Sequence, residues 1–208
     1  MIADVNLALI LLAALVATAS PGPATLAIAG TSMASGRRFG LALAAGVTTG
    51  SLTWSVAAAA GLSAVMLANT WAFEIMRYAG AGYLLFLALK SARSALAPGD
   101  LQTASIKTPT LKSAYRRGLV LHLTNPKAIL FFGALYAVGV PVGSSPATLA
   151  LVILAVGLQS LLLFHGYALL FSSPPLTAGY AKLRRWFEAV FAVAFAAAGL
   201  KILTARLS

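Results

Sequence analysis

The 208-residue chain contains no cysteine and only four acidic residues. The lack of cysteine excludes disulfide bonds, thiolate metal sites and thiol-disulfide relays. Charged residues make up only 9% of the chain and hydrophobic residues 60%, whereas soluble domains carry roughly 25% charged residues. The mean hydropathy is +0.91, which is typical of an integral membrane protein. We therefore expect one transmembrane domain over residues 1–208, with the lipid bilayer as a partner.

Sequence signatures of hydrolases and ATP-driven pumps are also missing. Intramembrane aspartyl proteolysis needs two aspartates within membrane spans, but Asp4 and Asp100 both lie outside the apolar stretches. The chain has no G-x-S-x-G, H-E-x-x-H or P-loop motif, so serine hydrolase, metalloprotease and ATPase chemistry have no support. The sequence therefore predicts that the protein is not an enzyme and has no cofactor and no metal site.

Six apolar stretches are long enough to cross a bilayer, which takes roughly 20 residues. The predicted fold class is therefore an all-α membrane protein with six transmembrane helices. The stretches cover about residues 6–28, 40–68, 72–91, 115–138, 147–171 and 187–205.

Basic residues gather in alternate gaps between these stretches and give a net charge of +11. Positive loops stay on the cytoplasmic side of a membrane, so both termini are predicted to be extracytoplasmic in a multi-pass cell (inner) membrane protein. Because the charges are divided among loops that flank spans, no nucleic-acid partner is expected. The cytoplasmic set is Arg37, Arg38, Lys90, Arg93, Lys107, Lys112, Arg116, Arg117, Lys182, Arg184 and Arg185.

Two proline breaks interrupt the first and fourth stretches, at residues 20–23 (Ser-Pro-Gly-Pro) and 124–127 (Thr-Asn-Pro-Lys). A proline removes a backbone donor and breaks a helix. In lipid the freed backbone groups are tolerated only where they are buried in protein or line a cavity. Pro21 and Pro126 lie about half a chain length apart, and a paired break of this kind indicates the binding site of a transporter.

The only long polar stretch, residues 94–113, is predicted to be a cytoplasmic linker. It separates half-repeats of about residues 1–93 and 114–208, each with three spans. An odd number of spans makes the second half enter the membrane in the opposite sense, so we expect an inverted 3+3 repeat with broken helices 1 and 4.

The breaks supply groups that suit an amino acid. The half-helix after Pro23 presents N–H groups and a positive dipole end to a carboxylate, and the unpaired carbonyls can accept from an ammonium. The second break adds two polar side chains, Asn125 and Lys127. The candidate substrate-binding residues are Ser20, Pro21, Gly22, Pro23, Gly46, Thr49, Gly50, Thr124, Asn125, Pro126 and Lys127.

Several of these residues have a structural alternative. A lysine deep in a span costs on the order of 2.5 to 3.5 kcal/mol, and Lys127 could offset this by binding a substrate carboxylate or by capping the carbonyls of another half-helix. Gly46 and Gly50 could serve helix packing alone. His122 and His165 are the proton-coupling candidates, against the alternative of neutral, hydrogen-bonded histidines. Gln159 is interpreted as an interhelical hydrogen-bond partner.

No carboxylate is expected at the centre of the bilayer, since Glu74 and Glu188 are placed at the ends of spans and Asp4 and Asp100 lie outside them. A cationic substrate is therefore disfavoured.

The chain resembles the LysE/RhtB family of bacterial amino acid exporters along nearly its whole length. The resemblance rests on residues 20–23, 46–50, 77–90 and 123–128 together with Gly118. It implies a six-helix inner-membrane protein that exports amino acids or their derivatives. It also marks residues 21–23 and 125–127 as translocation-site residues. Some relatives have an aspartate in the fifth span, where residues 156–164 of this chain contain no acid.

We therefore predict a secondary transporter that exports a small, neutral amino acid or derivative from the cytoplasm. Two alternatives stay open at this point: a small oligomeric membrane channel and a non-transporting membrane subunit. A homo-oligomer is compatible with each of them.

Overall fold

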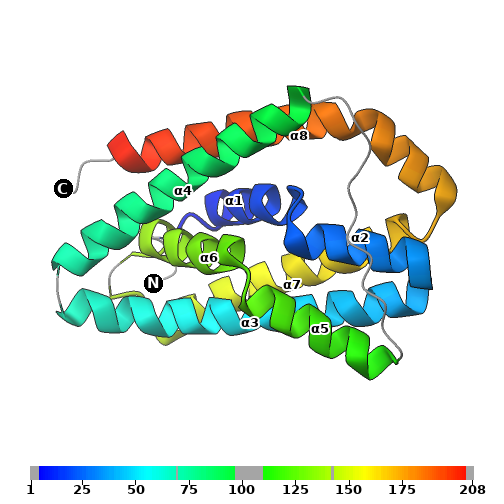
Figure 1. The fold of residues 1–208 in the computed structure, drawn as a ribbon. Coiled ribbons are helices and arrows are strands. Elements are labelled where there is room, and N and C mark those ends of the chain that lie inside the picture. The colour runs from blue at the N-terminus through cyan, green and yellow to red at the C-terminus, as the bar shows by residue number, and fades with distance from the viewer. Residues whose placement is uncertain (1–4, 69, 97–109, 142, 205–208) are drawn as a thin grey trace.

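The described part of the chain is helical throughout. The computed structural model describes residues 5–68, 70–96, 110–141 and 143–204, with the backbone alone for 62–68, 70–77, 138, 201 and 202. The expected all-α fold is confirmed in these residues. The helices shown in Figure 1 are α1 (Leu7–Ala19), α2 (Pro23–Ser35), α3 (Arg37–Ala68), α4 (Thr70–Leu96), α5 (Leu111–Leu123), α6 (Pro126–Gly139), α7 (Pro146–Leu170) and α8 (Pro174–Thr204).

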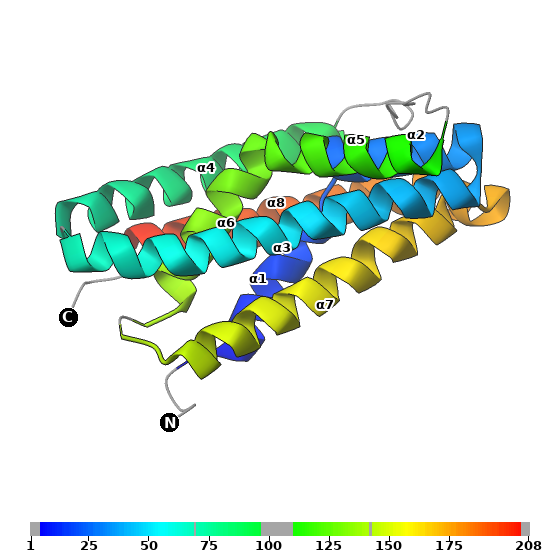
Figure 2. The ribbon, with the colours of Figure 1, turned by 90° about the horizontal axis from the view of Figure 1, so that it is seen from below.

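The chain runs back and forth between two ends of an elongated bundle. The α2–α3 and α7–α8 connections and the start of α5 lie at one end, on the right in Figure 1, and the α3–α4 connection lies at the other. Figure 2 shows α3, α4 and α7 extending along this same long axis. The basic residues that open α3 and α5 therefore lie at the same end of the bundle.

Both predicted breaks are present. Helices α1 and α2 meet at an angle of 52°, and α5 and α6 meet at 57°. Pro23 and Pro126 each occupy the first position of the second helix, where a missing N–H leaves no hydrogen bond unmade. The Asn125 side chain caps α6 by accepting from the backbone N–H of Lys127 at 3.0 Å, so local chemistry stabilises this break in addition to the proline.

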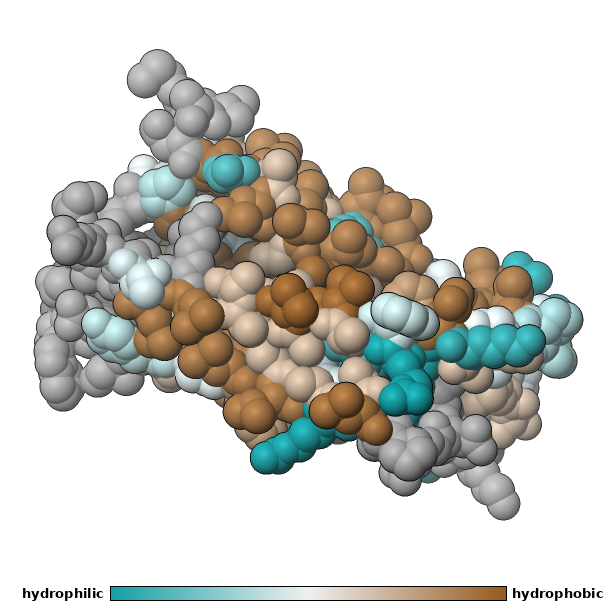
Figure 3. Space-filling view, turned by 90° about the horizontal axis from the view of Figure 1, so that it is seen from above, coloured by the Kyte–Doolittle hydropathy of each residue, from teal (hydrophilic) through white to brown (hydrophobic). Residues whose placement is uncertain are grey.

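Two helices, α3 over residues 37–61 and α7, are long and apolar enough to cross a membrane, and each bent pair passes the same test as one broken span. That gives up to four spans among the described residues, and α4 and α8 are not among them. Figure 3 shows apolar side chains over much of the face seen from above. The structure therefore supports membrane-spanning helices without establishing the six predicted from the sequence.

Two helix boundaries differ from those that we predict. Helix α8 begins at Pro174, well before residue 187, and α4 continues to Leu96, so the linker is shorter than residues 94–113. Charged residues that the sequence analysis assigns to loops therefore lie within these helices. Arg185 Nε donates to the Ala95 carbonyl at 2.9 Å, and Arg184 Nη2 donates to the Ser94 carbonyl at 3.4 Å. Because the guanidinium groups pair with the last carbonyls of α4, the helix accommodates their charge.

Glu188, which we predict at the end of a span, lies near the middle of α8 and is only 4% exposed. Asp4 and Asp100 and the side chain of Glu74 lie outside the described residues.

The buried apolar side chains form two separate clusters. The Tyr136 cluster is made mainly by α1, α4, α6, α7 and α8, and includes Phe131 and Phe132. The Ile28 cluster is made by α2, α3, α5 and α7, and includes Phe164. The bends at the two helix breaks separate these clusters, because α1 and α6 contribute to the first and α2 and α5 to the second.

Helices α3 and α5 pack with their backbones in direct contact. A Cβ atom on Gly46 would lie 2.0 Å from the carbonyl oxygen of Tyr115, and one on Gly118 would lie 2.2 Å from that of Leu43. Neither backbone atom can move without moving its helix. Close approach of this kind is common between membrane helices, and it holds α5 in place next to α3.

We expect Gly118→Ala to destabilise the protein by about 1 to 3 kcal/mol, the range for overpacking a dense core, and to lower its melting temperature in detergent. Gly46→Ala should act in the same direction. Gly166→Ala on α7 is the matched control, because a Cβ there meets nothing within 4 Å, and its melting temperature should equal or exceed that of the unmodified protein. Equal melting temperatures for the Gly118 and Gly166 variants would contradict the close α3–α5 contact.

Candidate functional site

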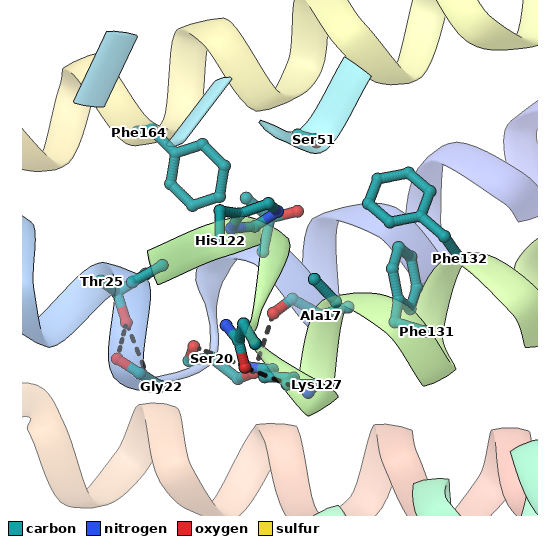
Figure 4. A pocket seen from close by; sticks show the side chains of 14 residues that line it. Ala17, Ser20, Gly22, Thr25, Ser51, His122, Lys127, Phe131, Phe132 and Phe164 are labelled. Carbon is teal, nitrogen blue, oxygen red and sulfur yellow. Dashed lines mark hydrogen bonds between the residues drawn. The ribbon is translucent and has the colours of Figure 1, made fainter. Parts of the chain in front are cut away.

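The two broken helices meet at a small cavity between the apolar clusters. Its volume is about 40 Å³, enough for a few water molecules at roughly 10 to 15 Å³ each. Figure 4 shows side chains from both breaks pointing toward it, together with Ser51 and Phe164. The cavity is lined by Ala17, Thr18, Ser20, Gly22, Ala24, Thr25, Ser51, His122, Asn125, Lys127, Ala128, Phe131, Phe132 and Phe164.

Lys127 joins the two breaks. Its Nζ donates to the Ser20 carbonyl oxygen at 2.9 Å and also to Ser20 Oγ. Ser20 is buried, and its hydroxyl donates to the Ala17 carbonyl at 3.0 Å. The ammonium group thus lies at the carboxyl end of α1, where the helix dipole is negative. This is the capping contact that we weighed for Lys127 from the sequence, and it links the first half of the chain to the second.

Aromatic donors from the opposite half satisfy further carbonyls at each break. The Tyr167 hydroxyl on α7 donates to the Ala19 carbonyl at 2.5 Å. Trp54 Nε1 on α3 donates to the His122 carbonyl at 3.4 Å. Both acceptors lie in the last turns of the half-helices that precede the breaks, where carbonyls lack the usual helical partner, although the His122 carbonyl also accepts from the Asn125 backbone N–H at 3.2 Å. These carbonyls at the carboxyl ends of α1 and α5 are therefore paired inside the protein, as lipid surroundings require.

The amino end of α2 faces the same cavity. Gly22 N donates to Thr25 Oγ1 at 2.8 Å, but no hydrogen bond from the N–H of Ala24 or Thr25 is present among the described residues. A Cβ on Gly22 would lie 3.3 Å from Lys127 Nζ, so the ammonium lies next to this helix end. Lys127 is thus positioned between the negative end of α1 and the positive end of α2.

His122 is buried at the wall of the cavity without a hydrogen bond. It is 5% exposed, and neither ring nitrogen has a partner among the described residues. Its ring packs edge-on against Phe164, with centroids 5.7 Å apart. Unpaired buried polar atoms are uncommon in folded proteins and call for a ligand, water or functional role. The His122 ring is therefore available to a molecule that enters the cavity.

The structure brings together some of the sequence-predicted residues. Ser20, Gly22, Asn125, Lys127 and His122 line the cavity, whereas Pro21, Pro23 and Pro126 shape the breaks beside it.

Other candidates lie away from the cavity. Thr49 accepts a hydrogen bond from the Tyr115 hydroxyl at 3.0 Å, and Gly46 packs against the α5 backbone. Gly50 packs closely against His122, because a Cβ atom on Gly50 would lie 2.9 Å from His122 Cβ. Thr124 is exposed and bonds to its own helix. His165 Nδ1 pairs with the Leu161 carbonyl at 2.9 Å.

The interpretation of Gln159 as an interhelical partner is confirmed, since its Nε2 donates to the Leu11 carbonyl at 2.9 Å.

Sequence reasoning missed several lining residues. Thr25 stands at the third position of the helix that starts at Pro23, where a side chain bonds back to the cap residue. The sequence pattern could therefore have identified Thr25. Ser51, which pairs with Ser160 at 2.9 Å, and the three lining phenylalanines carry no such signal. They lie within long apolar helices, and only packing decides which face points to the cavity.

A comparison with protein-family models matches residues 15–206 to the LysE type translocator family. The threonine efflux protein of Salmonella typhimurium is 27% identical over 194 residues, which cover 92% of this chain and 94% of the relative. The threonine efflux protein of Escherichia coli is 28% identical over 198 residues, with 92% and 94% covered. The leucine efflux protein of Klebsiella pneumoniae is 33% identical over 165 residues, with 79% and 77% covered. No solved structure matches the chain.

We expect His122→Met to raise the melting temperature. Methionine fills a similar volume and removes two buried, unpaired nitrogens, each of which costs about 1 to 3 kcal/mol when desolvated without a partner. His165→Met is the control, because that ring pairs with its own helix and does not line the cavity, and it should change the melting temperature little. A clear loss of stability in the His122 variant would show that the ring is hydrogen-bonded in the folded protein.

Proposed function

Because the chain belongs to the LysE type translocator family, we propose that it exports a small, neutral amino acid or amino acid derivative from the cytoplasm. Members of this family are transporters, so the protein is a multi-pass membrane transporter rather than an enzyme, and the resemblance identified in the sequence is confirmed. The main structural support for the proposed substrate is the meeting of two broken helices at the contact between Lys127 and Ser20.

The charges at the breaks are complementary to a zwitterion. The N–H groups of Ala24 and Thr25 at the positive end of α2 suit the substrate carboxylate, and Lys127 lies close enough to share it. The Ser20 carbonyl, at the negative end of α1, suits the substrate ammonium. The Lys127 ammonium now occupies that carbonyl, so binding would exchange one ammonium group for another while Lys127 turns toward the carboxylate.

A cavity of about 40 Å³ is smaller than an amino acid, so the helices must separate for a substrate to bind. The cavity lies between the Tyr136 cluster and the Ile28 cluster, and either cluster can open without the other. Phe131 and Phe132 belong to the first and Phe164 to the second. We infer that these aromatic residues close the two sides of the site in turn.

The lining residues favour a substrate with an uncharged side chain. No carboxylate lines the described cavity, while Ser51, Thr25 and the phenylalanines offer hydroxyl and apolar contacts. The relatives named for threonine and leucine efflux support the same class. The unpaired nitrogens of His122 are available for a substrate hydroxyl or for a coupled proton, whereas His165 is the weaker coupling candidate because it does not line the cavity.

We propose six spans arranged as an inverted 3+3 repeat within one domain, with both termini extracytoplasmic. Ser51 and Ser160 contact each other, and each is the fifteenth residue of its helix when counted from Arg37 and Pro146. Helix α1 touches α6 as α2 touches α5. Contacts between equivalent elements are what a two-fold axis between the halves produces.

The absence of cysteine allows a direct test of this orientation. We expect Ala147→Cys, at the exposed start of α7, to react with a membrane-impermeant maleimide in intact cells. Lys112→Cys, at the exposed start of α5, should react only after the membrane is permeabilised. The opposite pattern would reverse the proposed orientation, and equal labelling of both would contradict a membrane between them.

We expect Lys127→Met to reach the membrane in nearly normal amount and to lower transport about tenfold or more, since charge-assisted hydrogen bonds contribute about twice as much as neutral ones. The measurement is counterflow in proteoliposomes preloaded with L-threonine or L-leucine. Lys112→Met is the matched control, because Lys112 is exposed and distant from the cavity lining, and it should transport normally.

The same assay separates the open alternatives. Saturable counterflow supports a carrier, whereas linear flux that does not saturate supports a channel. If the unmodified protein accelerates the efflux of no amino acid in a panel, the proposed function is wrong.

A further inference from the structure

Glu188 is a buried carboxylate that no part of the site described above uses. It lies near the middle of α8, is 4% exposed, and accepts a hydrogen bond from Ser94 Oγ on α4 at 2.8 Å. Ionisable residues buried within membrane proteins are expensive and are functional candidates by default. The groups that surround the Glu188 carboxylate therefore indicate its role.

Glu188 lies on the same buried stripe of α8 as Phe191 and Phe195, which pack in the Tyr136 cluster with α1 and α6. Helix α8 also reaches Tyr167, whose hydroxyl binds the Ala19 carbonyl, because the Tyr180 ring meets the Tyr167 ring edge-on with centroids 6.4 Å apart. Figure 4 shows the ribbon of α8 on the side of the cavity where Ser20, Gly22 and Lys127 lie. Helix α8, with Glu188 near its middle, thus runs past the first helix break.

The two sides of the cavity are closed unequally. Helix α4 packs against α6, but its counterpart α8 makes at most sparse contact with α2 within the described residues. Fewer contacts therefore hold α2 against α8 than hold α6 against α4. Glu188 lies on α8 together with Tyr180, whose ring stacks on Phe187 and meets Tyr167 edge-on.

The hydrogen bond from Ser94 needs an acceptor but not a negative charge, so a structural link between α4 and α8 does not by itself explain a carboxylate. Among the residues that the structure describes, the cationic side chains on the helices beside Glu188 include Arg184, one turn earlier on α8, Lys90, one turn before Ser94 on α4, and Lys127 on α6. Arg184 donates to the Ser94 backbone, and Lys90 is exposed. If α2 and α8 separate, a substrate ammonium that enters between them would have two acceptors on this side of the cavity, the Glu188 carboxylate on α8 and the Ser20 carbonyl at the end of α1.

We propose that the Glu188 carboxylate receives the ammonium group of a zwitterionic amino acid on its way to the Ser20 carbonyl and so selects substrates that carry an α-amino group. This inference rests on the proposed export function. Glu188 and Lys127 then attract the two opposite charges of the same molecule, the carboxylate of the protein acting on the ammonium and the lysine on the substrate carboxylate.

Glu188→Gln tests the proposal, because the amide oxygen still accepts from Ser94 while the charge is lost. In proteoliposomes we expect the half-saturating concentration of L-leucine to rise about tenfold, as removal of one charge-assisted contact implies, with little change at saturation. Competition by 2-hydroxy-4-methylpentanoate, which carries a hydroxyl in place of the ammonium, should be unchanged. L-Threonine and 2,3-dihydroxybutanoate form a second pair of probes.

Ser94→Ala is the matched control, since it removes the hydrogen bond and leaves the charge, and we expect nearly normal selectivity between amino acid and hydroxy acid. Glu188→Asp retains the charge on a shorter side chain and should weaken amino acid binding alone, which keeps the test decisive if Glu188→Gln does not accumulate. Equal losses for amino acid and hydroxy acid, or a Ser94→Ala variant that behaves as Glu188→Gln does, would overturn the assignment. An unmodified protein that transports none of the probes would overturn the proposed function and this assignment with it.

Discussion

The hydrogen bond from the Lys127 ammonium to the Ser20 carbonyl is the interaction on which the site depends. Each proline break leaves backbone groups without a partner in their own helix, and lipid offers none. The protein therefore brings the breaks together, so that groups from one half pair with carbonyls of the other. Tyr167 and Trp54 extend the same solution to Ala19 and His122. Pairing the breaks satisfies these carbonyls and leaves a polar cavity between the two halves.

The helices around this cavity differ in how tightly they are held together. Gly46 and Gly118 hold α3 and α5 in backbone contact, which leaves little freedom between those helices. The phenylalanines on either side of the cavity belong to separate apolar clusters, which can open separately. The proposed alternating access needs a frame that stays fixed while the two sides of the site open in turn.

Two buried polar residues, His122 and Glu188, have no evident role in stability. Both nitrogens of His122 lack partners, and Glu188 carries a charge that its link to Ser94 does not need. Apolar side chains would pack at either position with a smaller desolvation penalty. Under the proposed function, a bound zwitterionic solute would supply a partner to the His122 ring and an opposite charge to Glu188.

The sequence by itself determined the membrane class, the helical fold and both breaks, because hydropathy over a span and the missing N–H of Pro23 and Pro126 are local properties. It also drew attention to Ser20, Asn125, Lys127 and His122, since polar residues in apolar helices are conspicuous. Only the tertiary structure decided that Lys127 binds Ser20, that Thr49 and Gly46 face another helix, and that Glu188 is buried within α8. Those outcomes depend on which helix faces meet. Side chains that lie far apart along the chain determine that together.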